Sequence, residues 1–533
     1  MQVMDLPCLP ELLQRAAQVH ADREAVVADG QSLSYAELNA RVLPVAQGLS
    51  QAGVRVGDRV LICLDNGLAL AEAIWGCLTA GAVIVPVHAT TKVERLRFLI
   101  QDAEPRLVLT SSAHQPVWVQ ACEGVNNAPT VVIAQVAAQA PGHHSWLGWP
   151  AQTTESVGHA PGHHIAEIQR QDLAALIYTS GTTADPKGVM LTHANMLAAL
   201  RSIQAYLGLK SSDRIFCALP MCFSYGLYHL FLAALAGACL YPEKAFSFPV
   251  KMVERMVQER ITVFPAVPTM LAMLLSLNLV RDTDWQHLRL ITNAGAALPG
   301  QHLQQIQEIW PGVSFVSMYG LTECARASYL PPEEAQHRVG SVGRGMPFQQ
   351  CWLVNEAGEP VPTGEVGELV VQGAHVMRGY WKQAEATALK LPAWGPDGTQ
   401  VLRTGDLFYA DADGYLFFVG RQDDIIKSRG EKVSPREVED VLHRIPGVRQ
   451  AAVIGVPDMT LGQAVHAHLV LDDGVSLSER EVIRFCLAHL ESFKAPQVVH
   501  FATSLPHTES GKVLKRHLAA SPHSFPSQSI TTS

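Results

Sequence analysis

The hydrophobic residues in the middle of the chain fall into two alternating kinds of segment. Short runs rich in apolar and β-branched residues predict strands, and longer runs with apolar residues three and four positions apart predict helices. The predicted strands are 173–179, 214–219, 261–266, 288–294 and 313–319, and the predicted helices are 194–207, 268–277 and 300–309. Strands and helices that alternate in this way form βαβ units, so the pattern predicts mainly parallel sheets covered by helices.

Changes in this pattern divide the rest of the chain. Residues 58–82 repeat the strand–helix pattern, whereas turns recur every few residues after Gly345 and predict a small antiparallel β unit. A compact segment of mixed strands and helices follows. We therefore predict an α/β protein with a large N-terminal domain at 1–420, a small mobile α+β C-terminal domain at 421–520, and a disordered polar tail at 521–533.

Composition narrows the class of protein. The chain has 533 residues, of which 48% are hydrophobic and 17% charged, as in soluble globular proteins of more than one domain. A net charge of −9 gives no reason to expect nucleic acid or an anionic membrane surface as partner. The longest apolar run, 227–241, is interrupted by His229 and is shorter than the ~20 residues of a spanning helix. The N-terminus lacks the charged start of a secretory signal, and ten scattered cysteines predict reduced thiols in a cytoplasmic protein.

One irregular stretch, 112–170, contains the sequence PGHH twice, at 141–144 and 161–164. Four histidines could bind a metal ion. No carboxylate or cysteine accompanies them at a useful spacing, so a solvated surface loop is the favoured interpretation.

The segment YTSGTTADPKGVMLTH, 178–193, has the composition of a phosphate-binding loop. It does not match the P-loop pattern Gly-x4-Gly-Lys-Ser/Thr. Because a predicted strand precedes it and a predicted helix follows it, we expect its backbone N–H groups to converge on an anion near a helix N-terminus. The alternative is a surface loop. The candidate anion ligands are Thr179, Ser180, Gly181, Thr182, Thr183 and Lys187.

Four further motifs follow, and each is ambiguous alone. In MYGLTECARAS, Tyr319 could stack on a base, Thr322 could hold phosphate and Glu323 could hold Mg²⁺. In RTGDLFYADADGYL, Asp406 could accept both hydroxyls of a ribose or form an Asx turn. The others are the basic loop GRQDDIIKSRGEKVSPREVE and the segment LPHTESGKVLKRHL, whose Lys512 would otherwise be a surface lysine.

In this order the five motifs resemble those of the adenylate-forming superfamily, which includes acyl- and aryl-CoA synthetases, adenylation domains and beetle luciferases. The resemblance covers roughly residues 10–518 and includes the weaker element GELVVQGAHVMRGYW from Gly367. It implies an AMP-forming acid–thiol ligase that uses ATP and Mg²⁺ to make an acyl-adenylate. The thiol acceptor would be CoA or the phosphopantetheine of a separate carrier protein. One departure is Ala184, at a position where the family usually has glycine.

The resemblance also implies residue roles. Segment 180–187 would cover the ATP phosphates, Thr322 would touch phosphate and Glu323 would ligate Mg²⁺. Lys512 would reach in during adenylation, and Asp423 would be the hinge about which the small domain turns before thiol attack. The residues expected around adenine and ribose are Asn293, Ala294, Gly295, Ala296, Tyr319, Gly320, Asp406 and Arg421, and those of the thiol-step loop are Lys427, Arg429 and Gly430.

The acid pocket is expected at the segment after FCALP, near Ala294–Ala297 and along Met318–Ala327. The residues of that segment are Met221, Cys222, Phe223, Ser224, Tyr225 and Gly226. Amino-acid-activating domains usually place an aspartate near Ser224, so an α-amino acid is disfavoured. Phe223, Tyr225 and Met318 favour a fatty or aryl acid. The alternative is that Phe223 and Tyr225 simply belong to the hydrophobic core. Two alternatives stay open: an amino-acid adenylation enzyme that loads a carrier protein, and an enzyme with a non-thiol acceptor.

Overall fold

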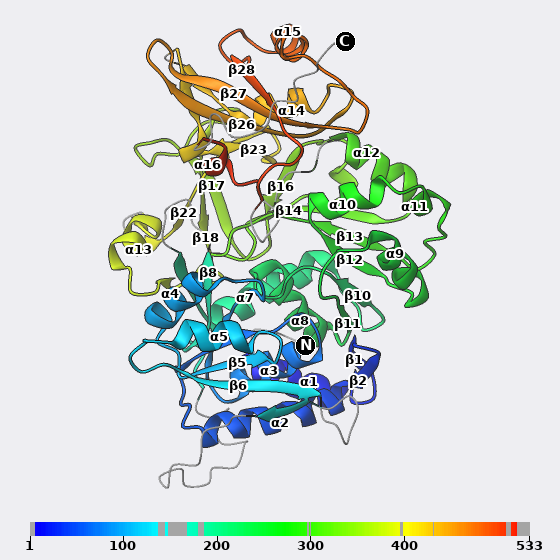
Figure 1. The fold of residues 1–533 in the computed structure, drawn as a ribbon, viewed down its shortest axis with the longest axis vertical. Helices are drawn as coiled ribbons and strands as arrows, with labels where there is room; N and C mark the ends of the chain where they lie inside the picture. Colours follow the sequence, from blue (N-terminus) through cyan, green and yellow to red (C-terminus); the bar gives the residue numbers. More distant parts are fainter. Residues whose placement is uncertain are drawn as a thin grey trace, which may run out of the picture.

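Two large sheets form the body of the protein, and a smaller sheet forms one end of it (Figure 1). The computed structural model describes residues 6–136, 144–147, 168–179, 186–295, 298, 300–394, 398–429, 431–507 and 513–519. Among these residues, no helix combines the length and apolar character that a membrane crossing requires.

The larger sheet has 13 strands and changes character at β14 (Ser314–Tyr319). On one side of β14 the neighbours are parallel as far as β1, and on the other side every neighbouring pair is antiparallel. In spatial order the strands are β17 (Gln350–Val354), β18 (Gly367–Gln372), β22 (Leu402–Ala410), β23 (Leu416–Arg421), β16 (Ser341–Gly345), β15 (Ser328–Tyr329), β14, β13 (Leu290–Asn293), β12 (Val263–Ala266), β10 (Arg214–Cys217), β11 (Cys239–Pro242), β1 (Glu24–Ala28) and β2 (Gln31–Ser34).

The second sheet has eight strands, with a parallel centre and antiparallel edges. Its order is β19 (Gly379–Tyr380), β9 (Lys187–Thr192), β8 (Leu173–Thr179), β4 (Val83–Pro86), β3 (Arg59–Cys63), β5 (Leu107–Ser111), β6 (Thr130–Val136) and β7 (His144–Leu147). A separate pair, β20 (Ala393–Trp394) and β21 (Thr399–Gln400), lies outside both sheets.

Helices cover these sheets and fill the space between them (Figure 1). One strongly apolar helix, α3, is buried all round except at Ala69, as expected of a helix packed on every side. The helices are α1 (Pro10–Val19), α2 (Tyr35–Gln51), α3 (Leu68–Thr79), α4 (Val93–Ala103), α5 (Gln115–Cys122), α7 (His193–Leu207), α8 (Ser224–Ala236), α9 (Pro249–Gln258), α10 (Pro268–Leu275), α11 (Asn278–Asp282), α12 (Gly300–Ile309) and α13 (Ala384–Lys390), with a 3₁₀ turn η2 (Pro332–Glu334).

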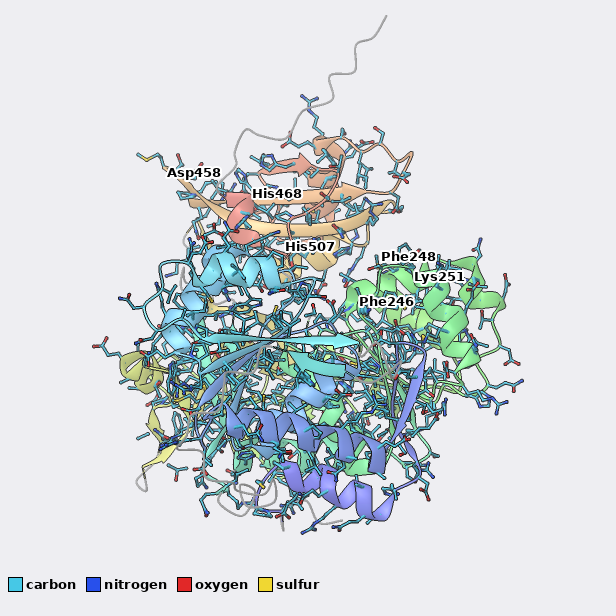
Figure 2. All side chains as sticks on the ribbon, turned by 60° about the horizontal axis from the view of Figure 1, so that its bottom comes forward. Phe246, Phe248, Lys251, Asp458, His468 and His507 are labelled. Carbon is cyan, nitrogen blue, oxygen red and sulfur yellow. The ribbon has the colours of Figure 1, made fainter. Side chains whose placement is uncertain are left out.

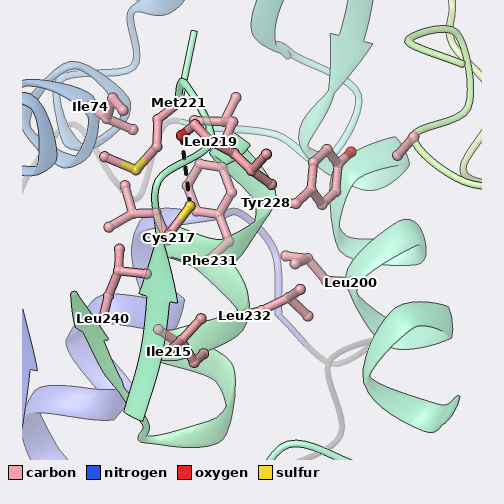
Figure 3. Close-up of a cluster of buried hydrophobic side chains, with 14 of the residues drawn as sticks. Ile74, Leu200, Ile215, Cys217, Leu219, Met221, Tyr228, Phe231, Leu232 and Leu240 are labelled. Atoms are coloured by element: carbon pink, nitrogen blue, oxygen red, sulfur yellow. Dashed lines mark hydrogen bonds between the residues drawn. The ribbon is translucent and has the colours of Figure 1, made fainter. Parts of the chain in front are cut away.

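The packing of β10 against α8 fixes the start of α8 (Figure 3). Apolar side chains from α3, α7, β10, α8 and β11 meet here and are almost fully buried. The Cys217 thiol donates to the Leu219 carbonyl at 3.7 Å, which closes the turn that leaves β10. The labelled members of this core are Ile74, Leu200, Ile215, Cys217, Leu219, Met221, Tyr228, Phe231, Leu232 and Leu240.

The smaller sheet and its helices form a compact unit with their own hydrophobic cores. In Figure 2, His468 and His507 lie on this unit, whereas Phe248 and Lys251 lie on the body. After the 3₁₀ turn η3 (Gln422–Asp424), its elements are β24 (Ile426–Ser428), β25 (Glu431–Val433), α14 (Pro435–Leu442), β26 (Val448–Asp458), β27 (Gly462–Leu471), α15 (Glu479–His489), β28 (Val498–Phe501) and α16 (Lys515–Ala519).

The predicted α/β fold is confirmed. Each predicted strand and helix of the middle region is present, with ends that differ by a few residues. The expectation of an irregular segment at 112–170 is wrong for its first part, because α5 and β6 lie there and β6 extends the sheet beside β5. Both PGHH sequences fall outside the described residues apart from His144, which begins β7.

Candidate active site

A tight loop after β14, 320–327, organises the site. A Cβ at Gly320 would lie 2.5 Å from the Ala325 carbonyl oxygen and 2.7 Å from the Arg326 Cα, so no side chain fits there. The loop returns through Ala325, whose φ of 60° is unusual for a residue other than glycine, and the Ala327 N–H donates to the Tyr319 carbonyl at 2.9 Å. The sequence around Thr322 therefore turns back on itself at the end of β14.

Glu323 is held by a tyrosine from another strand. It is 9% exposed, and its Oε1 accepts a 2.6 Å hydrogen bond from the Tyr380 hydroxyl. Strand β19 brings Tyr380 beside β9, where the Nζ of Lys187 lies 5.3 Å from the centre of the Tyr380 ring. Burial, and then the charge of Glu323, raise the pKa of Tyr380 well above its usual value. Tyr380 therefore stays protonated and acts as a donor.

A second carboxylate, that of Asp406, lies at the hydroxyl group of Tyr319. The Tyr319 hydroxyl donates to Asp406 Oδ2 at 2.5 Å, and the Nε of Arg421 lies 3.9 Å from Oδ1. The register of β22 and β23 places Asp406 opposite Arg421, and the Tyr319 ring packs edge-on against Phe408 with centroids 4.9 Å apart. Burial, followed by the charge of Asp406, raises the pKa of Tyr319. The structure thus brings Tyr319, Asp406 and Arg421 together.

The residues expected around adenine lie at the end of the neighbouring strand β13. Asn293 is the last residue of β13 and is fully buried, and Ala294 follows it. Gly295 has a φ of 92°, a conformation that glycine adopts without strain. Because β13 and β14 are parallel, their carboxyl ends meet at the same edge of the sheet. Ala296 and Ala297 lie outside the described residues.

The phosphate-loop expectation needs one correction. The segment after Thr179 is followed by strand β9, which runs antiparallel to β8, and α7 begins only at His193. No helix N-terminus follows the loop directly, because the apolar run at 187–192 pairs with β8 instead. Thr179 and Lys187 are Cα partners at the base of the loop. Ser180, Gly181, Thr182, Thr183 and Ala184 lie outside the described residues.

The predicted acid-pocket residues cluster at the start of α8 and the end of β14. Tyr225 and Thr292 share a hydrogen bond of 2.8 Å between their hydroxyls, and Met318 accepts one from Tyr206 at 3.1 Å. Gly226 has no room for a side chain, since a Cβ would lie 2.5 Å from the Pro220 carbonyl oxygen.

Two other residues of the expected pocket segment 221–226 make different contacts. Ser224, the first residue of α8, is buried. Phe223 stacks with His88 at a centroid distance of 6.0 Å.

Three expected groups lie on or near the small domain. Asp423 is exposed in η3, between β23 and β24. Lys427 and Arg429 are exposed on the β24–β25 hairpin, where Arg429 has a φ of 57°. Gly430 and Lys512 lie outside the described residues.

The sequence reasoning assigned no role to Tyr380, and it included Arg326 only within the pocket range 318–327 without singling it out. Tyr380 belongs to the RGYW end of the element from Gly367, which carried no assigned role. Arg326 lies inside MYGLTECARAS, yet it is 4% exposed, with its guanidinium 4.3 Å from the centre of the Tyr225 ring. The signal for Arg326 was a lone arginine in a segment otherwise free of basic residues.

Comparisons with known proteins place this site in a family. Models described as AMP-binding enzyme and AMP-binding enzyme C-terminal domain match residues 13–381 and 437–512. The feruloyl-CoA synthase of Amycolatopsis sp. is 34% identical, over 94% of this chain and 96% of its own length. The long-chain-fatty-acid–CoA ligase of Salmonella typhimurium is 31% identical, over 96% and 94%.

A solved structure agrees with these sequence matches. The anthranilate CoA ligase AuaEII in complex with anthranoyl-AMP superposes with a TM-score of 0.85 at 27% identity, over 98% of both chains. The chain therefore belongs to the AMP-binding enzymes, and it is an ATP-dependent ligase that activates a carboxylic acid as an acyl-adenylate and transfers the acyl group to a thiol.

Proposed function

We propose that this enzyme makes the CoA thioester of an aryl or fatty acid, with an aryl acid favoured. The observation that carries the proposal is the division of side chains at the end of β14. Neighbouring residues on a strand point to opposite faces, and here Tyr319 meets Asp406 whereas Met318 meets Tyr206. The nucleotide belongs on the Tyr319 face, so the body of the acid belongs on the Met318 face.

Aromatic side chains surround that second face. The rings of Tyr206 and Tyr329 stack at 4.3 Å with an angle of 12°. At the start of α8, the ring of Tyr225 faces the Arg326 guanidinium. All three rings keep part of their surface accessible. Flat aromatic walls suit a flat acid, because offset and edge-on ring contacts add to simple burial. The names of two similar proteins, a feruloyl-CoA synthase and an anthranilate CoA ligase, support this class.

Glu323 and the phosphates of ATP would hold Mg²⁺. Hard oxygen ligands suit this ion, which proteins usually bind through one or two carboxylates together with substrate phosphates and water. Among the described residues, Tyr380 is bonded to one oxygen of Glu323 and the other accepts no hydrogen bond, so the donor set fits. No cluster of three or more acidic, histidine or cysteine side chains able to hold a metal occurs in the described ranges. The ion would supply charge neutralisation, so that the acid carboxylate can approach the α-phosphorus.

The side chains then act on charge and position. Tyr380 fixes the orientation of Glu323, and Lys187, which lies beside the Tyr380 ring, would add positive charge at the phosphates. Asp406 is positioned to accept the ribose hydroxyls beside Tyr319. Lys512 would contribute during adenylation, and a turn about Asp423 would bring the loop containing Lys427 to the site for thiol attack.

The test is pyrophosphate release with MgATP over a panel of aryl, fatty and amino acids, with and without CoA. We expect multiple turnovers with an aryl or fatty acid only when CoA is present, together with formation of the acyl-CoA. Release of only one pyrophosphate per enzyme molecule, even after CoA is added, would point to a carrier-protein acceptor instead. Turnover restricted to amino acids would contradict the proposed acid class and the expectation that Ser224 disfavours an α-amino acid.

A further inference from the structure

Arg326 is a buried charge that has no acidic partner among the described residues. It is 4% exposed, and the only hydrogen bond that its side chain forms with the described residues runs from Nη1 to the Ala325 carbonyl at 2.6 Å. Its Nε is buried without an acceptor, and no carboxylate of the described residues forms an ion pair with it. Burying an unpaired guanidinium is costly, and the contact with the Tyr225 ring offsets only part of that cost.

His229 and the tyrosines near Arg326 are uncharged. Burial, and then the charge of Arg326, lower the pKa of His229 to about 3. The His229 Nδ1 lies 2.8 Å from the Tyr225 carbonyl, which can only accept, so Nδ1 carries the hydrogen of a neutral ring. Burial raises the pKa of Tyr225 to about 12 and those of Tyr206 and Tyr228 further. Among the described residues, no negative charge on this side of the loop compensates that of Arg326.

The nearest acidic residue in sequence, Glu323, does not supply the missing partner. Its carboxylate accepts from Tyr380, which is on the nucleotide side of the loop. Within the 320–327 loop, Glu323 therefore contacts Tyr380, whereas Arg326 contacts Tyr225. An anion that meets Arg326 must come from outside the described protein.

We propose that Arg326 binds a second anionic group of the acid substrate, so that the enzyme prefers acids carrying a carboxylate or sulfonate at the end remote from the group that is activated. This inference rests on the proposed function, which places the body of the acid beside Tyr225 and Met318. The planar fork of arginine matches the two oxygens of such a group and binds them bidentately.

The reacting carboxylate is a poorer partner for Arg326. That carboxylate must give up its charge as it attacks the α-phosphorus, and a bidentate guanidinium would stabilise it most before the reaction. A remote anion keeps its charge throughout, so contact with Arg326 favours binding without opposing the chemistry.

The experiment compares matched acids by kcat/KM for pyrophosphate release. Terephthalate is paired with para-isopropylbenzoate, and succinate with isocaproate, because an isopropyl group has nearly the shape of a carboxylate without its charge. We expect the wild type to prefer the dianion in at least one pair. In Arg326→Gln the ratio should fall about 10- to 100-fold, the effect typical of a lost hydrogen bond to a charged group. The ratio in Arg326→Lys should lie between those of the wild type and Arg326→Gln, since lysine keeps the charge but lacks the planar fork of arginine.

The control is Arg344→Gln, the same change at an exposed position of β16, which should leave both ratios unchanged. A wild type that prefers the isopropyl member of both pairs would overturn the inference, and this comparison needs no variant. Equal losses on both members of a pair in Arg326→Gln would overturn it too, because they indicate a structural role or contact with the reacting carboxylate. Turnover of monoacids without any dianion preference would refute this inference alone, whereas no turnover with any acid would refute the proposed function as well.

Discussion

The two sides of the 320–327 loop differ in how they treat charge. On the side that we propose for the nucleotide, Glu323 accepts from Tyr380, and Asp406 accepts from Tyr319 and lies near Arg421. On the side that we propose for the acid, Arg326 faces the Tyr225 ring and has no carboxylate partner among the described residues. One side positions negative groups for cations and hydroxyls, whereas the other presents a positive group to an anion.

This difference indicates how one loop can serve two ligands. Protein donors orient Glu323 and Asp406 before any ligand binds, so the nucleotide side is preorganised. The partner that Arg326 lacks would arrive with the substrate, so binding there depends on what the substrate carries. Substitutions on the nucleotide side should therefore lower the reaction rate. Substitutions on the acid side should mainly change which acids are preferred.

The largest effect is expected from Lys512→Ala, which removes the cation that the small domain would bring to the nucleotide side. Adenylation should fall about 10²- to 10³-fold, as for the loss of a donor from a preorganised site. Thiol attack on supplied acyl-adenylate should continue, because that step does not use this lysine. Pyrophosphate release and acyl-CoA formation measure the two half-reactions separately.

Lys515→Ala is the matched control for that variant. Its ammonium lies 2.7 Å from Glu439 within the small domain, so its loss should lower stability and leave adenylation nearly unchanged. Equal loss of both half-reactions in Lys512→Ala would contradict the division of roles between the steps.

Glu323→Gln should have the next largest effect. The new amide oxygen can still accept from Tyr380, so the geometry is kept while the negative charge is lost. Adenylation should fall about 10²-fold and require more Mg²⁺, since the carboxylate is the expected ligand. The measurement is a magnesium titration of pyrophosphate release. Glu333→Gln, at an exposed site in η2, is the control, and an unchanged magnesium dependence in Glu323→Gln would reject the metal assignment.

A smaller loss is expected for Tyr380→Phe, which removes the donor to Glu323 and keeps the ring beside Lys187. Adenylation should fall about tenfold, the low end for a hydrogen bond to a charged group. Combined with Glu323→Gln, the losses should be less than multiplicative, because both act through one contact. Fully multiplicative losses would show that the two residues act independently. Tyr409→Phe, on an exposed ring stacked against Phe417, is the control.

The sequence predicted the elements better than the contacts between them. Strands such as β8 and β14 were readable from local apolar runs, and the motif residues Tyr319 and Asp406 do meet in space. The helix expected directly after the phosphate loop was wrong because the run at 187–192 pairs with β8, and pairing depends on partners elsewhere in the chain.

The two missed residues have a different cause. The role of Tyr380 depends on β19 lying beside β9 and on a partner far away in sequence. The role of Arg326 depends on burial, and arginine is almost always exposed, so composition argues against it. Long-range pairing and the burial of a charge are properties of the packed structure, which local patterns do not encode.

The smallest effect concerns His229 on the acid side. Its pKa, about 3, lies below the usual 6.5 because of burial first and Arg326 second. As the pH falls below 6.5, the unfolded chain takes up the proton before the folded one, so the unfolding free energy falls towards pH 3. Histidine-labelled NMR should show no titration of His229 between about pH 5 and 8. In Arg326→Gln the pKa should rise but stay below 6.5, since burial persists. Titration of His229 near 6.5 in the wild type would show that this side of the loop is neither dry nor positively charged, and would remove the contrast between the two sides.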